Sequence, residues 1–461
     1  MIRVRGIGRW VGVPALLAFM LAWGVWSNLA QAQGNNNNTG GAVLATRAVG
    51  GVIIDQSGII RSASRQDLQE LSKTWQQFHR DLPEDFRQPS PSRAISLKYL
   101  DAELARSIRE GTALREEVCF LGGLTRIDYV LVYPDKQDIL IVGPAEPWRL
   151  HEKGYPVGTQ TGKPIMLLDD LLVALRAAFQ PQRTVISCSI DPTSEGIQRL
   201  NAFVRARRGN VDPVAFARAL EETIGPQIVT LTGVPESSHF ARVLVAADFR
   251  MKQISMGAEP APVPGLPSFV SLVASSGFRP NNMMPRWWLA PDYEPLARDE
   301  AGLTWKFQKA AVKTMAEADL YNTQGERVKT EEAAPIYRKW AELMTARYEE
   351  LSKADPVFGQ VRNCMDLATL GALIAQERLL EKAQLSLPAL LGEDIVATAK
   401  LTPARHVSPT AVFTRIRGGT MFVTGGVQIN PWEIASHQVT RPELATVRAS
   451  LPIPSGTWFA N

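Results

Sequence analysis

Three side chains have types that suit nucleophilic chemistry, although they lie far apart in the sequence. Cys188 sits late in a strand-like segment between Ser187 and Ser189, and Asp191 follows at its end, where α/β proteins often place functional groups. His239, at the start of a predicted helix, could act as the base for a thiol nucleophile. Nothing in the sequence brings His239 close to Cys188, so a buried core cysteine and a surface histidine are the alternative.

Patterns of other catalytic classes do not occur in the sequence. The five histidines are scattered, with no HExxH, CxxC or EF-hand loop, so we expect no metal site. The segment 158–164, GTQTGKP, has a proline where a phosphate-binding loop has a hydroxyl residue. No GxGxxG fingerprint follows a strand and no GxSxG nucleophile elbow is present. These patterns predict a protein without a cofactor.

A short aromatic and basic run suggests a binding surface. Arg286, Trp287 and Trp288 are consecutive, and Tyr293 follows them closely. Adjacent side chains of a strand point to opposite faces, so one tryptophan is a candidate for exposure. Trp and Arg commonly anchor protein interfaces. We therefore take these four residues as the candidate interaction surface, with burial between two domains as the alternative.

The N-terminus has the pattern of a secretory signal peptide. Three arginines precede an apolar run, 11–26, of 16 residues, which is shorter than the roughly 20 residues that span a bilayer. Ala30-Gln31-Ala32 then supplies the small residues of a cleavage site. We expect cleavage after Ala32 and export to the periplasm, cell envelope or exterior, without a stable membrane span afterwards. An uncleaved anchor is the alternative.

The charge of the chain gives no indication of a nucleic-acid partner. The formal charge is +4 over 461 residues, and removal of 1–32, which holds three arginines and no acidic residue, leaves +1. No long Lys/Arg block remains beyond the signal segment, so the basic footprint of a nucleic-acid binder is missing.

Cysteine usage leaves a disulfide open. An odd number of cysteines, Cys119, Cys188 and Cys364, leaves at least one thiol without an intramolecular partner. Cys119 and Cys188 could pair in an oxidising compartment. Burial as small hydrophobic residues is the alternative.

Periodicity and turn residues predict a mixed α/β (α+β) fold of two regions. The segment 33–48 is rich in Asn and Gly and predicts a disordered leader. The α/β domain at 49–257 has predicted hairpins at 52–60 and 127–142, helices at 68–82, 167–179, 194–207 and from Ser238, and a strand at 184–190. The exposed face of the helix from Ser238 carries Arg242, Asp248, Arg250 and Lys252, and is expected to be solvated.

A proline-rich segment, 258–268, predicts a stiff linker and the domain boundary. The second region, 269–461, is expected to be α+β. Its predicted elements are a strand at 303–315, a helical hairpin of 334–353 and 357–383, and a C-terminal β-hairpin of 411–416 and 420–429 around Gly418-Gly419.

Several strings resemble an exported planctomycete-type family that is known as a domain of unknown function. They are Gly123–Val130, Tyr133-Pro134, Gly143–Trp148, Ser187–Thr193, Val234-Pro235, Asp248–Lys252, Pro285–Trp288 and Thr424–Val427. The resemblance extends over most of the predicted mature chain and implies a large secreted or envelope protein. It implies no activity and no catalytic residues.

Export and the failure of the catalytic patterns together predict a noncatalytic, envelope-associated protein. Its partner would be another envelope protein or a wall component. The alternative function is an envelope hydrolase or transferase that uses Cys188, His239 and Asp191.

Overall fold

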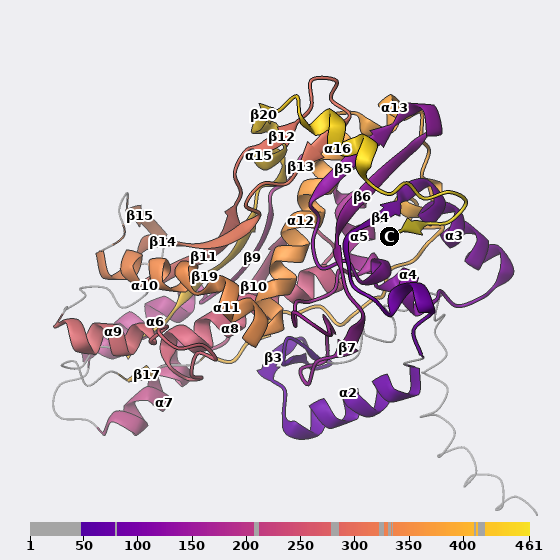
Figure 1. Ribbon diagram of the computed structural model, residues 1–461. Helices are drawn as coiled ribbons and strands as arrows, with labels where there is room; N and C mark the ends of the chain where they lie inside the picture. Colours follow the sequence, from indigo (N-terminus) through magenta and orange to yellow (C-terminus); the bar gives the residue numbers. More distant parts are fainter. Residues whose placement is uncertain are drawn as a thin grey trace, which may run out of the picture. The chain divides into compact units, whose positions relative to one another are not determined.

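The computed structural model describes residues 48–78, 81–206, 212–277, 285–321, 327–330, 333, 335–409, 412–413 and 420–461. The predicted signal peptide, the leader up to residue 47 and the turn at Gly418-Gly419 lie outside these residues. The described chain combines two large β-sheets with helices (Figure 1). The predicted mixed α/β class is therefore confirmed.

A ten-stranded sheet contains strands from both sides of the proline-rich segment. Its order is β1 (Ala48–Val49), β2 (Val52–Ile54), β3 (Ile59–Ser62), β16 (His406–Val407), β10 (Gln227–Thr232), β9 (Ile186–Asp191), β19 (Thr424–Ile429), β11 (Pro285–Asp292), β14 (Ala311–Tyr321) and β15 (Arg327–Thr330). The predicted hairpin β2/β3 and the strand β9 are confirmed. β9 lies between β10 and β19, and it pairs antiparallel with both.

A seven-stranded sheet is built around the β5/β6 hairpin. Its order is β20 (Gln438–Thr440), β12 (Leu296–Arg298), β13 (Thr304–Lys306), β5 (Tyr129–Tyr133), β6 (Asp138–Ala145), β4 (Ser90–Ser96) and β21 (Phe459–Ala460). The hairpin turns through Pro134–Lys136 and Gln137, whose φ is 52°. The predicted hairpin is confirmed, because proline and left-handed backbone favour a tight reversal.

Two small pairings complete the β structure. β7 (Trp148–Leu150) pairs with β8 (Pro156–Gly158), and β17 (Val412–Phe413) pairs with β18 (Thr420–Met421). The strand expected at 303–315 is instead two strands, β13 and β14, which belong to different sheets. Lys309, with φ 39°, interrupts the extended backbone between them.

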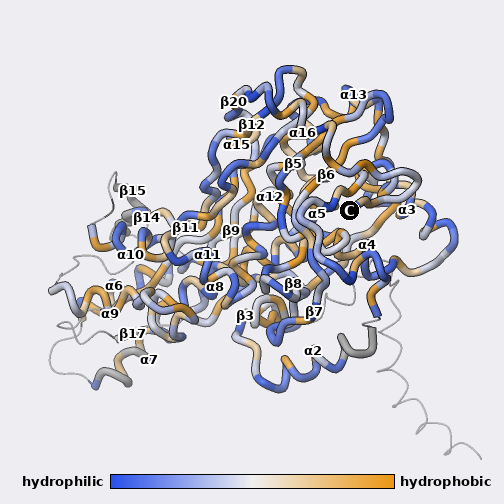
Figure 2. Tube along the Cα trace, in the orientation of Figure 1, coloured by the Kyte–Doolittle hydropathy of each residue, from blue (hydrophilic) through white to orange (hydrophobic). Residues whose placement is uncertain are grey.

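Among the described residues, eight helices fall before and just after the proline-rich segment. They are α2 (Arg65–Phe78), α3 (Leu97–Glu110), α4 (Glu116–Cys119), α5 (Leu168–Ala178), α6 (Ser194–Ala206), α7 (Pro213–Ile224), α8 (His239–Met256) and α9 (Phe269–Ser276). The expected helices are present, and α3, α4, α7 and α9 are additional. Figure 2 shows mostly hydrophilic residues along α2, whereas every residue of α8 is buried.

The remaining helices include the expected hairpin, in a more broken form. They are α10 (Pro335–Ala346), α11 (Tyr348–Ala354), α12 (Pro356–Gln376), α13 (Leu379–Lys382), α14 (Pro388–Leu391), α15 (Pro431–Ser436) and α16 (Leu444–Ser450). The first predicted helix is divided at Arg347, and the second between α12 and α13. Pro335 and Pro356 open their helices, where a missing N–H is tolerated.

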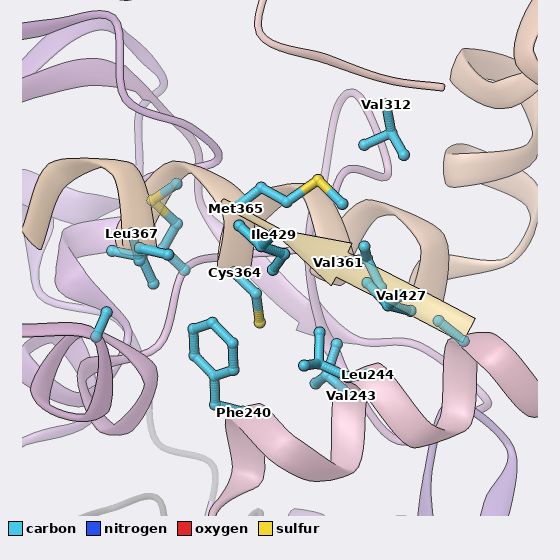
Figure 3. Close-up of a cluster of buried hydrophobic side chains, with 14 of the residues drawn as sticks. Phe240, Val243, Leu244, Val312, Val361, Cys364, Met365, Leu367, Val427 and Ile429 are labelled. Atoms are coloured by element: carbon cyan, nitrogen blue, oxygen red, sulfur yellow. The ribbon is translucent and has the colours of Figure 1, made fainter. Parts of the chain in front are cut away.

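The core packs α8 against α12 and the large sheet. Figure 3 shows Phe240 and Leu244 of α8 beside Cys364 of α12 and Val427 of β19. The polar residues of α8 are buried as well, which corrects the expectation of a solvated face: Arg242, Asp248, Arg250 and Lys252 are all less than 9% exposed. The helix is enclosed on all sides, and each of these side chains has an internal hydrogen-bond partner. Arg242 Nε and Asp248 Oδ1 are nevertheless buried without one.

The proline-rich segment is packed against the core. Val263 and Leu266 are buried in the main hydrophobic cluster, and the Trp340 indole donates to the Pro267 carbonyl. Strands from before and after 258–268 also share both large sheets. That 258–268 separates two independently folding domains remains a prediction.

Candidate functional site

Cys188 is buried at the centre of the ten-stranded sheet. It pairs with Leu231 of β10 and Val427 of β19, and its side chain is 0% exposed. Burial, together with the nearby Asp248 carboxylate, raises the pKa of the thiol well above its ordinary value. A thiol in this setting stays protonated near neutral pH, and the thiolate is the nucleophilic form.

His239 has a different partner. Its Nδ1 lies 3.0 Å from both carboxylate oxygens of Asp170 on α5, and both side chains are buried. Burial lowers the pKa of His239, but the charge and hydrogen bond of Asp170 outweigh it and the net direction is upward. The carboxylate thus overcomes the unfavourable position of a cation at the N-terminus of α8.

Asp191 contacts the aromatic and basic run rather than the thiol. Its Oδ1 accepts from Arg286 Nη1 at 2.8 Å and from the Gly425 N–H at 3.4 Å. Among the hydrogen bonds and ion pairs of the described residues, none joins any two of Cys188, His239 and Asp191. The structure therefore does not assemble the thiol set.

Arg286, Trp287 and Trp288 of the candidate interaction surface are buried, and Tyr293 is half-buried. Trp287 is 0% exposed and Trp288 9%, because β11 is an interior strand between β19 and β14. Trp287 Nε1 donates to the Tyr337 carbonyl, and the Arg286 guanidinium lies 4.5 Å from the Trp288 ring centroid. Tyr293 donates its hydroxyl hydrogen to Asp366 on α12. An exposed patch of these residues is absent.

The three cysteines lie in the core. Cys119, Cys188 and Cys364 all lie in the described part of the chain, all are buried, and no disulfide joins any of them. The disulfide expected as one possibility between Cys119 and Cys188 is therefore not formed, and the three side chains fill the core as small hydrophobic residues.

A buried cation connects α8 to two strands. Lys252 Nζ donates to Asp248 Oδ2 at 2.9 Å, to the Ile190 carbonyl at 2.6 Å and to the Gly425 carbonyl at 3.2 Å. These acceptors use the three N–H groups of an ammonium. Burial raises the pKa of Asp248 to about 7 despite the lysine. The spacing of four residues was visible in the sequence, but its burial was not.

A surface cavity of about 500 Å³ lies beside α5. Its wall is formed by the C-terminal half of α5, the loops that follow α5 and β10, and the segment 393–398. Apolar side chains such as Val173, Ala177 and Val234 line it together with Gln180, Gln182 and Thr184. Sequence reasoning missed the cavity, because its wall comes from three loops with no shared motif.

Arg176 holds one wall of the cavity in place. Its Nε donates to the Leu390 carbonyl at 3.1 Å, and its Nη2 donates to the carbonyls of Gly392 and Val396 at 3.0 and 2.8 Å. Nη1 makes none of these bonds, although Arg176 lines the cavity. Burial lowers the pKa of Arg176, and the Glu393 carboxylate opposes that shift. Arg176 and Glu393 thus bring opposite charges to one cavity.

The segments around the cavity expose large hydrophobic side chains. Phe179, at the end of α5, is 41% exposed, and Ile395 is 40% exposed. Nearby, the Arg183 guanidinium lies 4.8 Å from the ring centroid of Trp432. Trp432 lines a small neighbouring hollow that shares Ala177, Thr184 and Gly233 with the cavity. Exposed apolar groups beside a cavity are typical of a binding region.

Metal and membrane features were searched in the described part of the chain. Within it, no group of three or more His, Cys, Asp or Glu side chains is placed to hold a metal ion. None of its helices has the length and apolar character to cross a bilayer.

Comparison with known proteins identifies one segment. Residues 188–269 match a family described as a protein of unknown function (DUF1598). These residues form a domain of unknown function. The matched segment runs from β9 to the first residue of α9 and contains Cys188, Asp191, His239 and Lys252. No curated protein and no solved structure matches the chain.

Proposed function

We propose that this chain is an exported, noncatalytic binding protein of the periplasm or cell envelope, and that the cavity beside α5 is its ligand site. The cavity is the observation that carries the proposal. Its volume of about 500 Å³ lies within the range of about 300 to 1,000 Å³ that is usual for ligand sites. Its mixed apolar and polar lining suits recognition of an organic ligand.

The chemistry of the lining supports binding rather than turnover. Its residues include no Cys, His, Ser, Tyr or Lys, so the wall has no nucleophile with an adjacent imidazole or amine base. The guanidinium in the wall, Arg176, is fixed by backbone carbonyls. Fixed groups around a preformed cavity lower the entropic cost of binding.

Export rests on the N-terminal sequence and on the resemblance to an exported family. The arginines, the apolar run and Ala30-Gln31-Ala32 are the features that support it. The ligand would then be an envelope protein segment or a wall component, which is the partner class that this compartment offers.

Native mass spectrometry of the protein isolated from its own envelope tests the proposal. We expect a chain that begins at Gln33 and carries a co-purifying ligand, and a Val234→Trp variant, with its cavity filled, that carries none. Asn430→Asp on the α15 side, away from the lining, is the matched control. Unprocessed chain in the cytosol, or a ligand retained equally by Val234→Trp, would contradict the proposal.

A further inference from the structure

We infer that the cavity takes a short peptide with a free amino end, a free carboxylate end and small aliphatic side chains. The inference rests on the proposed binding function and names the ligand class of that same site. It follows from the charged, neutral polar and apolar groups that line the cavity.

Opposite charges are present in the cavity without a direct ion pair between them. Arg176 and Glu393 both line it, and the ion pairs of the described residues include none between them. Nε and Nη2 of Arg176 donate to backbone carbonyls of 390–396. Nη1 is therefore the nitrogen that can donate to a ligand. A guanidinium nitrogen favours a carboxylate, and the exposed Glu393 carboxylate favours an ammonium group. A zwitterionic ligand satisfies both.

The neutral polar groups fit peptide bonds. Gln180 and Gln182 each offer an amide that can donate and accept, and Thr184 and Thr398 add hydroxyl groups. A peptide unit likewise presents one donor and one acceptor. The side-chain amides can therefore hydrogen-bond to both the N–H and the C=O of a peptide unit.

The apolar lining limits the size of the ligand side chains. Val173, Ala177 and Val234 provide short aliphatic walls, and a cavity of about 500 Å³ has room for a peptide of a few small residues. No aromatic ring is among the lining residues, so the wall lacks the stacking surface on which bases and similar rings depend. Alanine-like side chains fit this wall best.

Isothermal titration calorimetry on the full mature chain tests the ligand class. The probes are alanyl-alanine, its N-acetylated form, its C-terminal amide and the β-1,4-linked disaccharide of N-acetylglucosamine. We expect alanyl-alanine to bind, and blocking either end to weaken binding about tenfold, which corresponds to about 1.4 kcal/mol. The disaccharide is expected not to bind.

A matched pair of variants tests the contact between Glu393 and the amino end of the ligand. Glu393→Gln should weaken alanyl-alanine about tenfold and leave the affinity of the N-acetylated form unchanged, since that form lacks the ammonium. Glu443→Gln, at an equally exposed glutamate outside the lining, should change neither. Melting temperatures within a degree or two of the parent chain establish that the variants are folded.

Two results would overturn the inference, and a third would overturn the proposed function instead. Disaccharide binding that Val234→Trp abolishes would replace the peptide by a glycan and keep the binding function. Equal effects of Glu393→Gln and Glu443→Gln on alanyl-alanine binding would show that Glu393 does not contact the ammonium group. Hydrolysis of the dipeptide at this cavity would keep the ligand class and overturn the noncatalytic role.

Discussion

Lys252 is a buried cation whose acceptors come from three elements: α8 itself, β9 through Ile190, and β19 through Gly425. A buried charge is tolerated only with close partners, because moving it out of water costs several kcal/mol. The side chain therefore fixes how the helix meets the two strands. The matched family segment contains both the lysine and its partner Asp248.

Lys252→Met should destabilise the protein by about 3 to 5 kcal/mol, because it leaves the Asp248 carboxylate buried without its cation. The loss should be smaller at pH 6 than at pH 8, since burial raises the pKa of Asp248 to about 7 and the acid can protonate. Chemical denaturation measures both values. The double variant Asp248→Leu/Lys252→Met should lose less; a larger loss than in the single variant would refute this account.

His239 gives a stability contribution that depends on pH. Because the net shift raises its folded pKa above the unfolded value of 6.5, the contribution is complete below pH 6.5 and is lost as pH rises through the folded pKa. The difference in melting temperature between the parent chain and His239→Gln should therefore shrink from pH 6 to pH 8.5.

An exposed histidine provides the comparison for that series. His406 lies on the surface in β16, and His406→Gln is the matched control for the loss of an imidazole. A melting-temperature difference for His239→Gln that does not change with pH would show that the contact with Asp170 does not favour the imidazolium.

At the scale of elements, β19 owes its central place to two glycines. A methyl group at Gly425 would overlap the Trp287 carbonyl of β11, and one at Gly426 would overlap the Cys188 carbonyl of β9. Gly425 also has a φ of +113°, which side chains rarely adopt. The strand can therefore approach both neighbours only where Cβ atoms are missing.

Gly426→Ala should destabilise the protein by more than about 3 kcal/mol, because either β9 or β19 must move. Gly111→Ala is the control: its Cβ meets nothing within 4 Å although its φ is +63°, and it should cost about 1 to 2 kcal/mol for the left-handed backbone alone. Urea unfolding compares the two variants, and similar losses would contradict the steric explanation.

At the scale of the whole molecule, the strands of the predicted first domain depend on partners from the second. β9 pairs with β19, β10 with β16, and β5 with β13. Each of these pairings joins residues before 258 to residues after 268. An unpaired central strand leaves a row of backbone groups unsatisfied and invites aggregation.

Separate expression of 49–257 and 269–461 should therefore give insoluble or poorly structured fragments, and mixing them should recover folded material. Circular dichroism and gel filtration follow the outcome. Two soluble fragments with cooperative thermal unfolding would instead establish 258–268 as a true boundary between independent domains.

The sequence by itself determined the local elements. Ser238 before an apolar period predicted α8, and its hydroxyl caps the Ala241 N–H; Pro134 predicted the β5/β6 turn. Such features depend on neighbours within a few residues, so they can be read without knowledge of the fold. The mixed α/β class follows from them.

Only the tertiary structure decided which distant residues meet. Asp191 meets Arg286 and His239 meets Asp170, whereas the sequence suggested Asp191 and His239 as partners of Cys188. The cavity joins α5 to the segment 393–398, which lies more than 200 residues later in the chain. Strand order and burial depend on contacts across the whole chain. The residue pattern of one segment therefore does not indicate which distant segment covers it.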